Sequence, residues 1–513
     1  MISFAGPGGV RRARVWRRLI YLGLAGIWLG TACWEANKPL PPGLRTESAW
    51  HTLPATDVSF IADITSADAY GRPVSSQAIF DEVLQTVRAA REFLVLDYFL
   101  FNSRRGALEA SSAPLRLISG ELRDALLERR RQLPALKVLF ITDPVNELYG
   151  AAPSADLRLL RAAGVDVVVT DLDRLRDSNL IYSSLWRLAL GWWSRDARGH
   201  GWLPSPLDES DSAVTFGSWA QLVNFKANQR KVIVADDGRG GLIGIVASAN
   251  PHDASSAHSN VAAKIKGPAV RSLLDSELAV ARFSGWQGSI DVPQSRAGDT
   301  SNPPNTDVDG NTEQTARVQV LTEGAIRAAL LERLEAAGRG DSVAVAMFYL
   351  SDRAVVDSLL GAGRRGASVR IILDPNKDAF GRTKSGIPNQ PVASELVSAS
   401  DGTIHVRWYR THGEQFHTKL VVVYGPQRLW LMLGSANLTR RNVGDYDLEA
   451  DLAVEVARSS QLASQTLEYF EALWNNRASL GIEYTAEFAT YADPEALHYW
   501  LYRLLEGTGM CDF

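Results

Sequence analysis

A histidine and a lysine two residues apart open an apolar stretch late in the chain. His417 and Lys419 precede the run LVVVY, and a loop later the sequence reads GSAN, with Ser435 and Asn437. A spacing of two along a β-strand places both side chains on one face. An imidazole can then attack a phosphodiester while an ammonium and an amide donate to its nonbridging oxygens. The pattern predicts phosphoryl chemistry that needs donors more than it needs a metal.

An altered version of this motif lies earlier in the chain. Lys231 opens an apolar stretch, and ASAN follows, with Ser248 and Asn250. The interval from the lysine to the asparagine is 19 residues here and 18 in the later motif. The histidine position is taken by Gln229, which is neither a phosphoryl nucleophile nor an acid. The predicted phosphate-binding residues are Ser248, Asn250, Ser435 and Asn437, beside the two lysines.

Without a histidine at position 229, the proton for a leaving group needs another source. His252 and His258 follow ASAN, and His412 lies five residues before His417. Either one of them supplies the proton, or all three are ordinary polar loop residues and a good leaving group departs without an acid. No Cys and His spacing indicates a zinc site, and no Gly-rich loop indicates a nucleotide cradle. We therefore expect neither a metal nor a cofactor.

The elements around the motifs occur twice. A helical stretch over 79–93 leads to an apolar strand at 94–101 and later to a strand ending at Asp143-Pro144. The same order returns from residue 325 and ends at Asp374-Pro375. This repeat predicts an α/β fold of two similar halves, with layered sheets flanked by helices. The predicted parts are a signal or membrane anchor (1–35), a tether (36–56), a first half (57–287) with a Trp-rich insertion (173–222), a linker (288–316), a second half (317–480) and a C-terminal helical extension (481–513).

The two motifs and the duplication resemble the phospholipase D superfamily, whose members carry two HxK(x)4D motifs, each followed by a GSxN-type segment. The bacterial phospholipase D and cardiolipin synthase-like branch is the nearest in appearance. The resemblance implies two halves related by a pseudo-twofold axis, one shared active site without a metal, and a covalent phosphohistidine intermediate.

The resemblance also assigns roles to residues. His417 is the expected nucleophile, and Lys231 and Lys419 bind the phosphate. The acid that orients the motif histidine lies about a dozen residues beyond the Asn, which selects Glu449; its counterpart in the first half falls near Asn260, an amide. The degenerate motif positions are Gln229 for His, Tyr424 for Asp, and Asp236, which fits the pattern.

The N-terminal sequence predicts that the protein is located at a bacterial cell membrane or exported to the envelope. Five Arg within residues 1–18 precede an apolar run at 19–34 of about 16 residues. The run suits an uncleaved anchor, a cleaved signal, a lipoprotein signal ending at Cys33, or a buried helix. Removing those five charges from the overall charge of −4 leaves a body at −9, which argues against a nucleic-acid partner. The N-terminal segment favours a phospholipid membrane as the partner.

The insertion contains a stretch crowded with Trp at 181–203. It predicts either a helical lid packed on its own domain, or a segment that dips into a membrane interface or lines an acyl-chain groove. The expected function is hydrolysis or transfer of a phospholipid phosphodiester. The alternatives are an impaired member of the family that binds lipid or phosphate, and a nuclease of the same superfamily.

Overall fold

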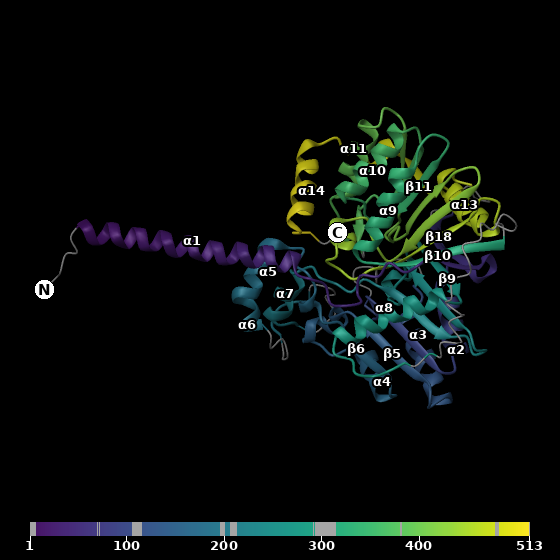
Figure 1. Ribbon diagram of the computed structural model, residues 1–513, viewed down its shortest axis with the longest axis horizontal. Helices are drawn as coiled ribbons and strands as arrows, with labels where there is room; N and C mark the ends of the chain where they lie inside the picture. The colour runs from purple at the N-terminus through teal and green to yellow at the C-terminus, as the bar shows by residue number, and fades with distance from the viewer. Residues whose placement is uncertain are drawn as a thin grey trace.

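Two α/β halves stack on each other in the computed structural model, with one long helix projecting from the side (Figure 1). In Figure 1 the second half, in green and yellow, lies above the first half, in blue and teal. The residues that the structure describes are 7–68, 70, 72–104, 115–194, 201–205, 213–290, 292, 314–379, 382–477 and 482–511.

The first half is built on an eight-stranded sheet in the order β3-β2-β9-β8-β7-β4-β5-β6. Strands β4, β5 and β6 are parallel to one another, and the remaining pairs are antiparallel. Central strands such as β4 and β7 are buried along their whole length, as expected for Val- and Ile-rich strands covered on both faces. The strands are β2 (Val58–Ala67), β3 (Pro73–Ser76), β4 (Phe93–Tyr98), β5 (Lys137–Thr142), β6 (Asp166–Val169), β7 (Lys231–Asp236), β8 (Leu242–Ala247) and β9 (Asn260–Lys266).

The second half repeats this sheet within the order β1-β10-β18-β17-β16-β11-β12-β15-β19. Seven consecutive strands, β10 to β15 in that order, correspond to β2 to β6 of the first half in position and direction. The duplication and the α/β class predicted from the sequence are confirmed. The strands are β1 (His51–Pro54), β10 (Thr315–Thr322), β11 (Ser342–Met347), β12 (Ser368–Leu373), β15 (Ile404–Tyr409), β16 (Lys419–Tyr424), β17 (Arg428–Gly434), β18 (Ala450–Ala457) and β19 (Thr485–Glu487).

One hydrophobic core joins the two halves. It contains Val232 and Val246 from the first sheet and Leu420 and Leu431 from the second. Helix α8 (Ala269–Phe283) of the first half contacts β10 of the second, and helix α13 (Gln461–Trp474) of the second contacts β2 of the first. The other helices associated with the sheets are α2 (Ile79–Ala89), α3 (Ile118–Gln132) and α4 (Ala155–Ala162) in the first half, and α9 (Gly324–Ala336), α10 (Arg353–Arg364), α11 (Asn389–Ser398) and α12 (Arg440–Val443) in the second.

The segments outside the repeat are more integrated than their composition suggests. The expected tether 36–56 places β1 on the edge of the second sheet, where it pairs with β10, and its Leu44 and Leu53 are buried. The C-terminal extension contributes β19 to the same sheet and ends in helix α14 (Ala496–Thr508). Most of the expected linker lies outside the described residues.

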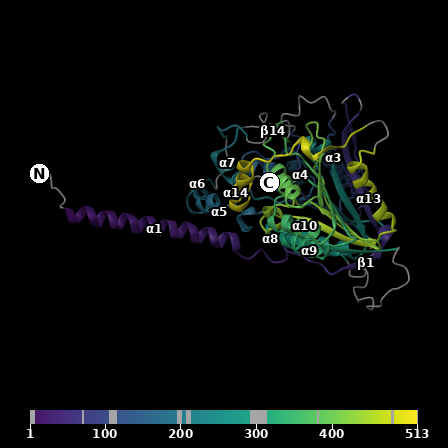
Figure 2. The same ribbon diagram turned by 90° about the horizontal axis from the view of Figure 1, so that it is seen from above.

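The N-terminal helix and the insertion meet at one end of the molecule. Helix α1 (Pro7–Asn37) includes 24 residues, Arg14–Asn37, that are apolar enough to cross a membrane and are almost entirely unburied. The insertion forms α5 (Leu180–Leu185), a π-helical turn (Trp186–Leu190), α6 (Gly191–Ser194) and α7 (Phe216–Leu222). Seen from above, α5, α6, α7 and α14 gather where α1 joins the body (Figure 2).

Candidate active site

The two motif lysines occupy equivalent places at the start of equivalent strands. Lys231 begins β7 and Lys419 begins β16, and both side chains are buried. The Lys231 ammonium donates to the carbonyl of Gln229 and lies 5.4 Å from the ring centroid of Phe99. The Lys419 ammonium donates to the carbonyl two residues before it over 3.2 Å and lies 5.3 Å from a second Phe ring. Each ammonium therefore keeps donors that these contacts do not use.

His417 is half-buried, and a first-half side chain fixes its tautomer. Its Nδ1 lies 3.1 Å from Oδ1 of Asn260. The amide group of Asn260 donates to the carbonyl of His258 over 3.1 Å, so its oxygen faces His417 and accepts. The hydrogen of the neutral imidazole therefore lies on Nδ1, and the lone pair lies on Nε2, the atom suited to attack.

The hydroxyls of the two motif serines donate to other side chains of the site. The hydroxyl of Ser248 donates to Oδ1 of Asn260 over 2.9 Å, and the hydroxyl of Ser435 donates to Glu449. Both serines are fully buried. The sequence analysis predicted both serines as phosphate contacts; in the structure their hydroxyls donate to the side chains at positions 260 and 449.

The resemblance assigned Glu449 to orient His417, whereas the structure places Asn260 at Nδ1 of His417. The carboxylate of Glu449 accepts from Ser435 and, over 2.5 Å, from the amide of Asn442. Its neighbour Leu448 exchanges backbone hydrogen bonds with Ala227 and Gln229, over 3.0 and 2.8 Å, so Glu449 lies on the Gln229 side of the site.

The reason is that each motif packs against the other half. The backbone N–H of Leu448 donates to Ala227, and that of Ser259 donates to Gln415 over a closely similar distance, 3.0 and 3.1 Å. These two cross-half contacts are equivalent in the duplication. The residue after Ser259 therefore meets His417, whereas Glu449 belongs to the position of Gln229.

Two buried aspartates that the sequence analysis did not assign to the site position the motifs. Asp143 accepts the backbone N–H of Asn228 over 2.8 Å, and Asp374 accepts that of Phe416 over 2.7 Å. Burial raises the pKa of each to about 7. Their signal in the sequence was the pair of matching Asp-Pro corners, each of which holds the residue just before the motif.

His258 is the one candidate acid found beside His417. Their ring centroids are 5.8 Å apart, and Nδ1 of His258 accepts the backbone N–H of Gln415 over 3.2 Å. Burial lowers the pKa of His258 to about 3, so its ring is neutral at physiological pH. Nδ1 of His252 lies 2.9 Å from a serine hydroxyl, and His412 is exposed with its Nδ1 3.6 Å from Glu414.

Electrostatics link the lysines of the two halves. Burial lowers the pKa of Lys231 to about 8, although Glu449 opposes the shift. Burial and the charge of Lys231 hold the pKa of Lys419 well below its usual range. Burial and both ammonium groups also hold the pKa of His417 well below its usual value. The imidazole is therefore neutral and nucleophilic at physiological pH.

The asparagines of the two GSAN-type segments are buried at equivalent places. Oδ1 of Asn250 accepts the backbone N–H of Leu100 over 3.2 Å, which leaves its amide hydrogens for other acceptors. Oδ1 of Asn437 has no hydrogen-bond partner among the described residues. The motif positions Asp236 and Tyr424 lie at the far ends of β7 and β16; Asp236 accepts backbone N–H groups at the start of β4, and Tyr424 accepts from an arginine.

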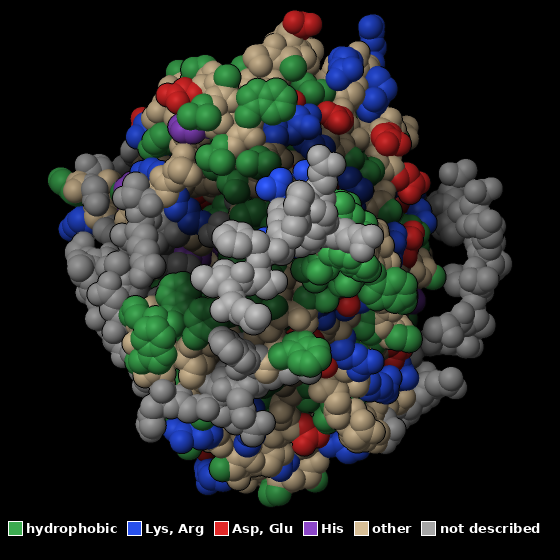
Figure 3. All heavy atoms as spheres, turned by 90° about the vertical axis from the view of Figure 1, so that its left-hand side faces the viewer, with side chains coloured by type: hydrophobic (Ala, Val, Ile, Leu, Met, Phe, Trp, Pro, Cys, Tyr) green, Lys and Arg blue, Asp and Glu red, His purple; other side chains and the backbone are tan. Residues whose placement is uncertain are grey.

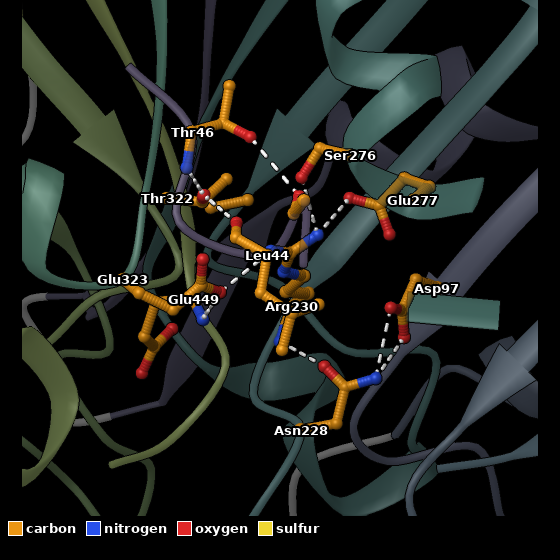
Figure 4. A network of polar contacts seen from close by, with 12 residues as sticks. Leu44, Thr46, Asp97, Asn228, Arg230, Ser276, Glu277, Thr322, Glu323 and Glu449 are labelled. Atoms are coloured by element: carbon orange, nitrogen blue, oxygen red, sulfur yellow. Dashed lines mark hydrogen bonds and ion pairs between the residues drawn. The ribbon is translucent and has the colours of Figure 1, made fainter. Parts of the chain in front are cut away.

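An arginine between the first-half motif residues joins the halves behind the site (Figure 4). Arg230 is fully buried and pairs with Glu277 on α8 over 3.1 Å and with Glu323 before α9 over 2.7 Å. Glu323 also accepts the backbone N–H of Glu449 over 3.2 Å. The backbone that carries the lysine of the first half is thus tied to the second half by buried charge.

Within the described part of the chain, one cluster has the composition of a metal site, and it lies elsewhere. Asp493, Glu495 and His498 stand at the start of α14. The site around His417 and the lysines shares no residue with it.

Comparison with known proteins finds a family model that matches part of the second half. The sequence of residues 330–474 matches the phospholipase D-like domain of the cardiolipin synthase family. Over these residues, in the second half, the chain is similar to a phospholipase D-like domain. No curated protein sequence matches it significantly.

Three solved structures are similar to the chain to different extents. Phosphatidylserine synthase from Haemophilus influenzae Rd KW20 has 12% identity, with 94% of this chain and 99% of that chain covered and a TM-score of 0.52. Polyphosphate kinase from Porphyromonas gingivalis has 12% identity, 92% and 55% coverage and a TM-score of 0.42. The phospholipase D family member Nuc from Salmonella typhimurium has 21% identity, 31% and 95% coverage and a TM-score of 0.24. At 12% identity, the likeness to the phosphatidylserine synthase concerns the fold alone.

Proposed function

We propose that this protein is a phospholipase D-type phosphodiester hydrolase or phosphatidyltransferase that acts on phospholipids through a phosphohistidine at His417. The observation that carries the proposal is the pair Lys231 and Lys419. These two buried ammonium groups, one from each half, lie close enough for the charge of one to lower the pKa of the other, and neither forms an ion pair within the described ranges. A phosphodiester anion supplies acceptors for the ammonium hydrogens that these lysines leave unused.

The chemistry follows from the tautomer of His417. Nε2 attacks phosphorus, and the bond from phosphorus to the leaving oxygen breaks with its electron pair. The ammonium groups and the asparagine amides donate to the nonbridging oxygens as charge redistributes. The phosphorylated ring keeps its hydrogen on Nδ1, where Asn260 accepts it. Attack by water or an alcohol then breaks the P–N bond, the attacking oxygen loses its proton to solvent, and His417 is released neutral.

The leaving oxygen must take its proton from solvent, because Gln229 has none to give. This slows the first step for an alkoxide and favours substrates whose leaving group is a weak base. We expect a slower enzyme than one with a histidine in each motif.

A phospholipid substrate is supported by three features. Helix α1 is apolar enough to cross a membrane, the matched domain is that of cardiolipin synthases, and the fold is shared with a phosphatidylserine synthase. The net negative charge of the body is unfavourable for a nucleic-acid substrate.

A second function has a specific observation in its favour. Gln229 and Asn260 are neutral amides at the two positions where the mechanism uses an acid and an orienting carboxylate. A protein that binds phospholipid phosphate without turnover would keep the lysines and asparagines and could lose both of these groups.

The test is to trap the intermediate on purified full-length protein in mixed phospholipid micelles. We expect mass spectrometry to find a phosphorylated His417 and an assay of released head group to find turnover. Both should disappear in His417→Ala and persist in the control His412→Ala, which changes an exposed histidine. Binding of lipid without adduct or turnover would favour the non-catalytic function. Cleavage of DNA in a parallel reaction, with phospholipid intact, would make the protein a nuclease and refute the lipid substrate.

A further inference from the structure

Helix α14 turns its apolar face outward. Four large apolar side chains follow helical spacing on it and are 40–73% exposed, while Tyr502 and Glu506 face the body and are buried. The exposed residues are Leu497, Trp500, Leu501 and Leu504. A surface helix of a globular protein normally buries this face, so the arrangement indicates a partner with an apolar surface.

The insertion presents a similar stripe. Along α5, the π-helical turn and α6, four large apolar side chains at helical spacing are 41–78% exposed. They are Ile181, Leu185, Leu188 and Trp192. Leucine with tryptophan on one face is the composition of helices that lie in the interface of a bilayer.

Both stripes adjoin the base of α1. The backbone of Gly509, which ends α14 with a φ of +72°, lies so close to the carbonyl of Ser178 that no Cβ would fit there. Glu35 lies two residues before the end of α1 and forms an ion pair with Arg187 of the insertion. Arg187 also pairs with Asp177 over 2.6 Å. Figure 3 views this end of the molecule, and hydrophobic side chains gather on it.

One hydrogen bond fixes the position of the insertion helices along the axis of α1. The indole N–H of Trp28 donates to the carbonyl of Ile181 over 3.2 Å. Trp28 lies six residues before the end of the apolar run 19–34, which is about 9 Å along a helix. Suppose that the membrane contained only the part of the apolar run from residue 19 to Trp28. These roughly ten residues would span about 15 Å, which is half of a bilayer core of about 30 Å. A spanning α1 therefore brings the start of α5 to the level of the membrane.

We propose that α1, the stripe of residues 181–192 and the stripe of α14 form one bilayer-binding surface, in which α1 spans the membrane and both stripes lie in the interface between head groups and acyl chains. The proposal rests on the membrane location in the proposed function but not on catalysis. It chooses membrane contact over a lid for the exposed face of the insertion. The surface keeps the body against the bilayer instead of on a free tether.

Depth-dependent fluorescence quenching tests this on the full chain. Single cysteines replace Leu188, Trp500 or, as a control, Leu159, an exposed leucine on α4, in a Cys33→Ser background; the remaining Cys511 is buried. Each is labelled with an environment-sensitive fluorophore and reconstituted into phosphatidylcholine–phosphatidylglycerol vesicles. We expect lipids with a shallow nitroxide to quench the labels at 188 and 500 several-fold more than the label at 159.

Equal, weak quenching at all three sites would overturn the proposal. A spectral shift at 188 or 500 that depends on protein concentration, without quenching by lipid, would overturn it too, since it would assign the stripes to a second copy. The same labels in His417→Ala should give the same quenching whether or not the wild-type protein turns over phospholipid. A failure of the proposed function is thereby separated from a failure of this inference.

Discussion

Gln229→His is the substitution that the structure predicts to raise activity. Position 229 corresponds to His417 in the duplication, and the contacts that frame the two positions, from Ala227 to Leu448 and from Gln415 to Ser259, match at 3.0 and 3.1 Å. Asn260 contacts His417, and Glu449 occupies the place equivalent to Asn260 in the duplication. A histidine at position 229 should therefore contact Glu449. The carboxylate needed to orient it is already present.

The expected gain follows from general acid catalysis. A positioned acid contributes roughly 10²- to 10⁴-fold, which is about 3–5 kcal/mol of transition-state stabilisation. Glutamine and histidine have similar volumes, and position 229 is half-buried, so the substitution costs little packing. The gain should fall on substrates with an alkoxide leaving group and should be small for p-nitrophenyl esters, whose leaving group needs no proton.

The assay is kcat/KM of wild type and Gln229→His on a phospholipid and on a p-nitrophenyl phosphodiester. Adding Glu449→Gln to the Gln229→His variant should remove most of the gain, since a neutral amide cannot stabilise the imidazolium that donates the proton. An unchanged rate on phospholipid in a folded Gln229→His protein would refute the idea that the missing acid limits turnover. A gain that survives Glu449→Gln would refute the pairing across the halves.

Three further outcomes follow from the same geometry. Asn260→Asp places a carboxylate at Nδ1 of His417, so the pKa of that imidazole should rise and the acid limb of the kcat/KM profile should move to higher pH. In the wild type that acid limb should lie below pH 6.5, and activity should fall as pH rises through about 8, because the ammonium of Lys231, whose pKa is about 8, loses its proton there. Arg230→Met leaves two buried carboxylates without their cation and should lower the free energy of unfolding by about 3–5 kcal/mol in urea titrations, whereas Arg317→Met, which breaks an exposed pair, should change it by less than about 1 kcal/mol.

The repeat was predictable from the sequence because local patterns carry it. Two helices, two apolar strands, two Asp-Pro corners and two GSAN-type segments recur in the same order, and each is visible in a few consecutive residues. The strands at 94–101 and 342–350 were placed within three residues of β4 and β11. The composition of the tether predicted a free segment, because nothing local shows that residues 51–54 pair with a strand more than 260 residues later.

The pairing inside the site was not predictable in this way. Counting from the second GSAN segment leads to Glu449, but the residue that touches His417 comes from the first half, at Asn260. The contact depends on how two sheets pack, which no single motif records. A duplicated sequence allows two pairings, within a half and across halves, and the hydrogen bonds of Ser259 and Leu448 decide for the second.

With Glu449 moved away from His417, its charge acquires a different role. A buried carboxylate is costly unless it is compensated, and here two donors, Ser435 and Asn442, satisfy its oxygens while Lys231 and Lys419 supply opposite charge. In return, its charge opposes the loss of protons from both lysines. The carboxylate of the histidine-free position therefore favours the charged form of both lysines, which is the form that binds phosphate in the proposed mechanism. The two halves therefore contribute different groups to the site: the second half supplies Glu449 beside Gln229, and the first half supplies Asn260 beside His417.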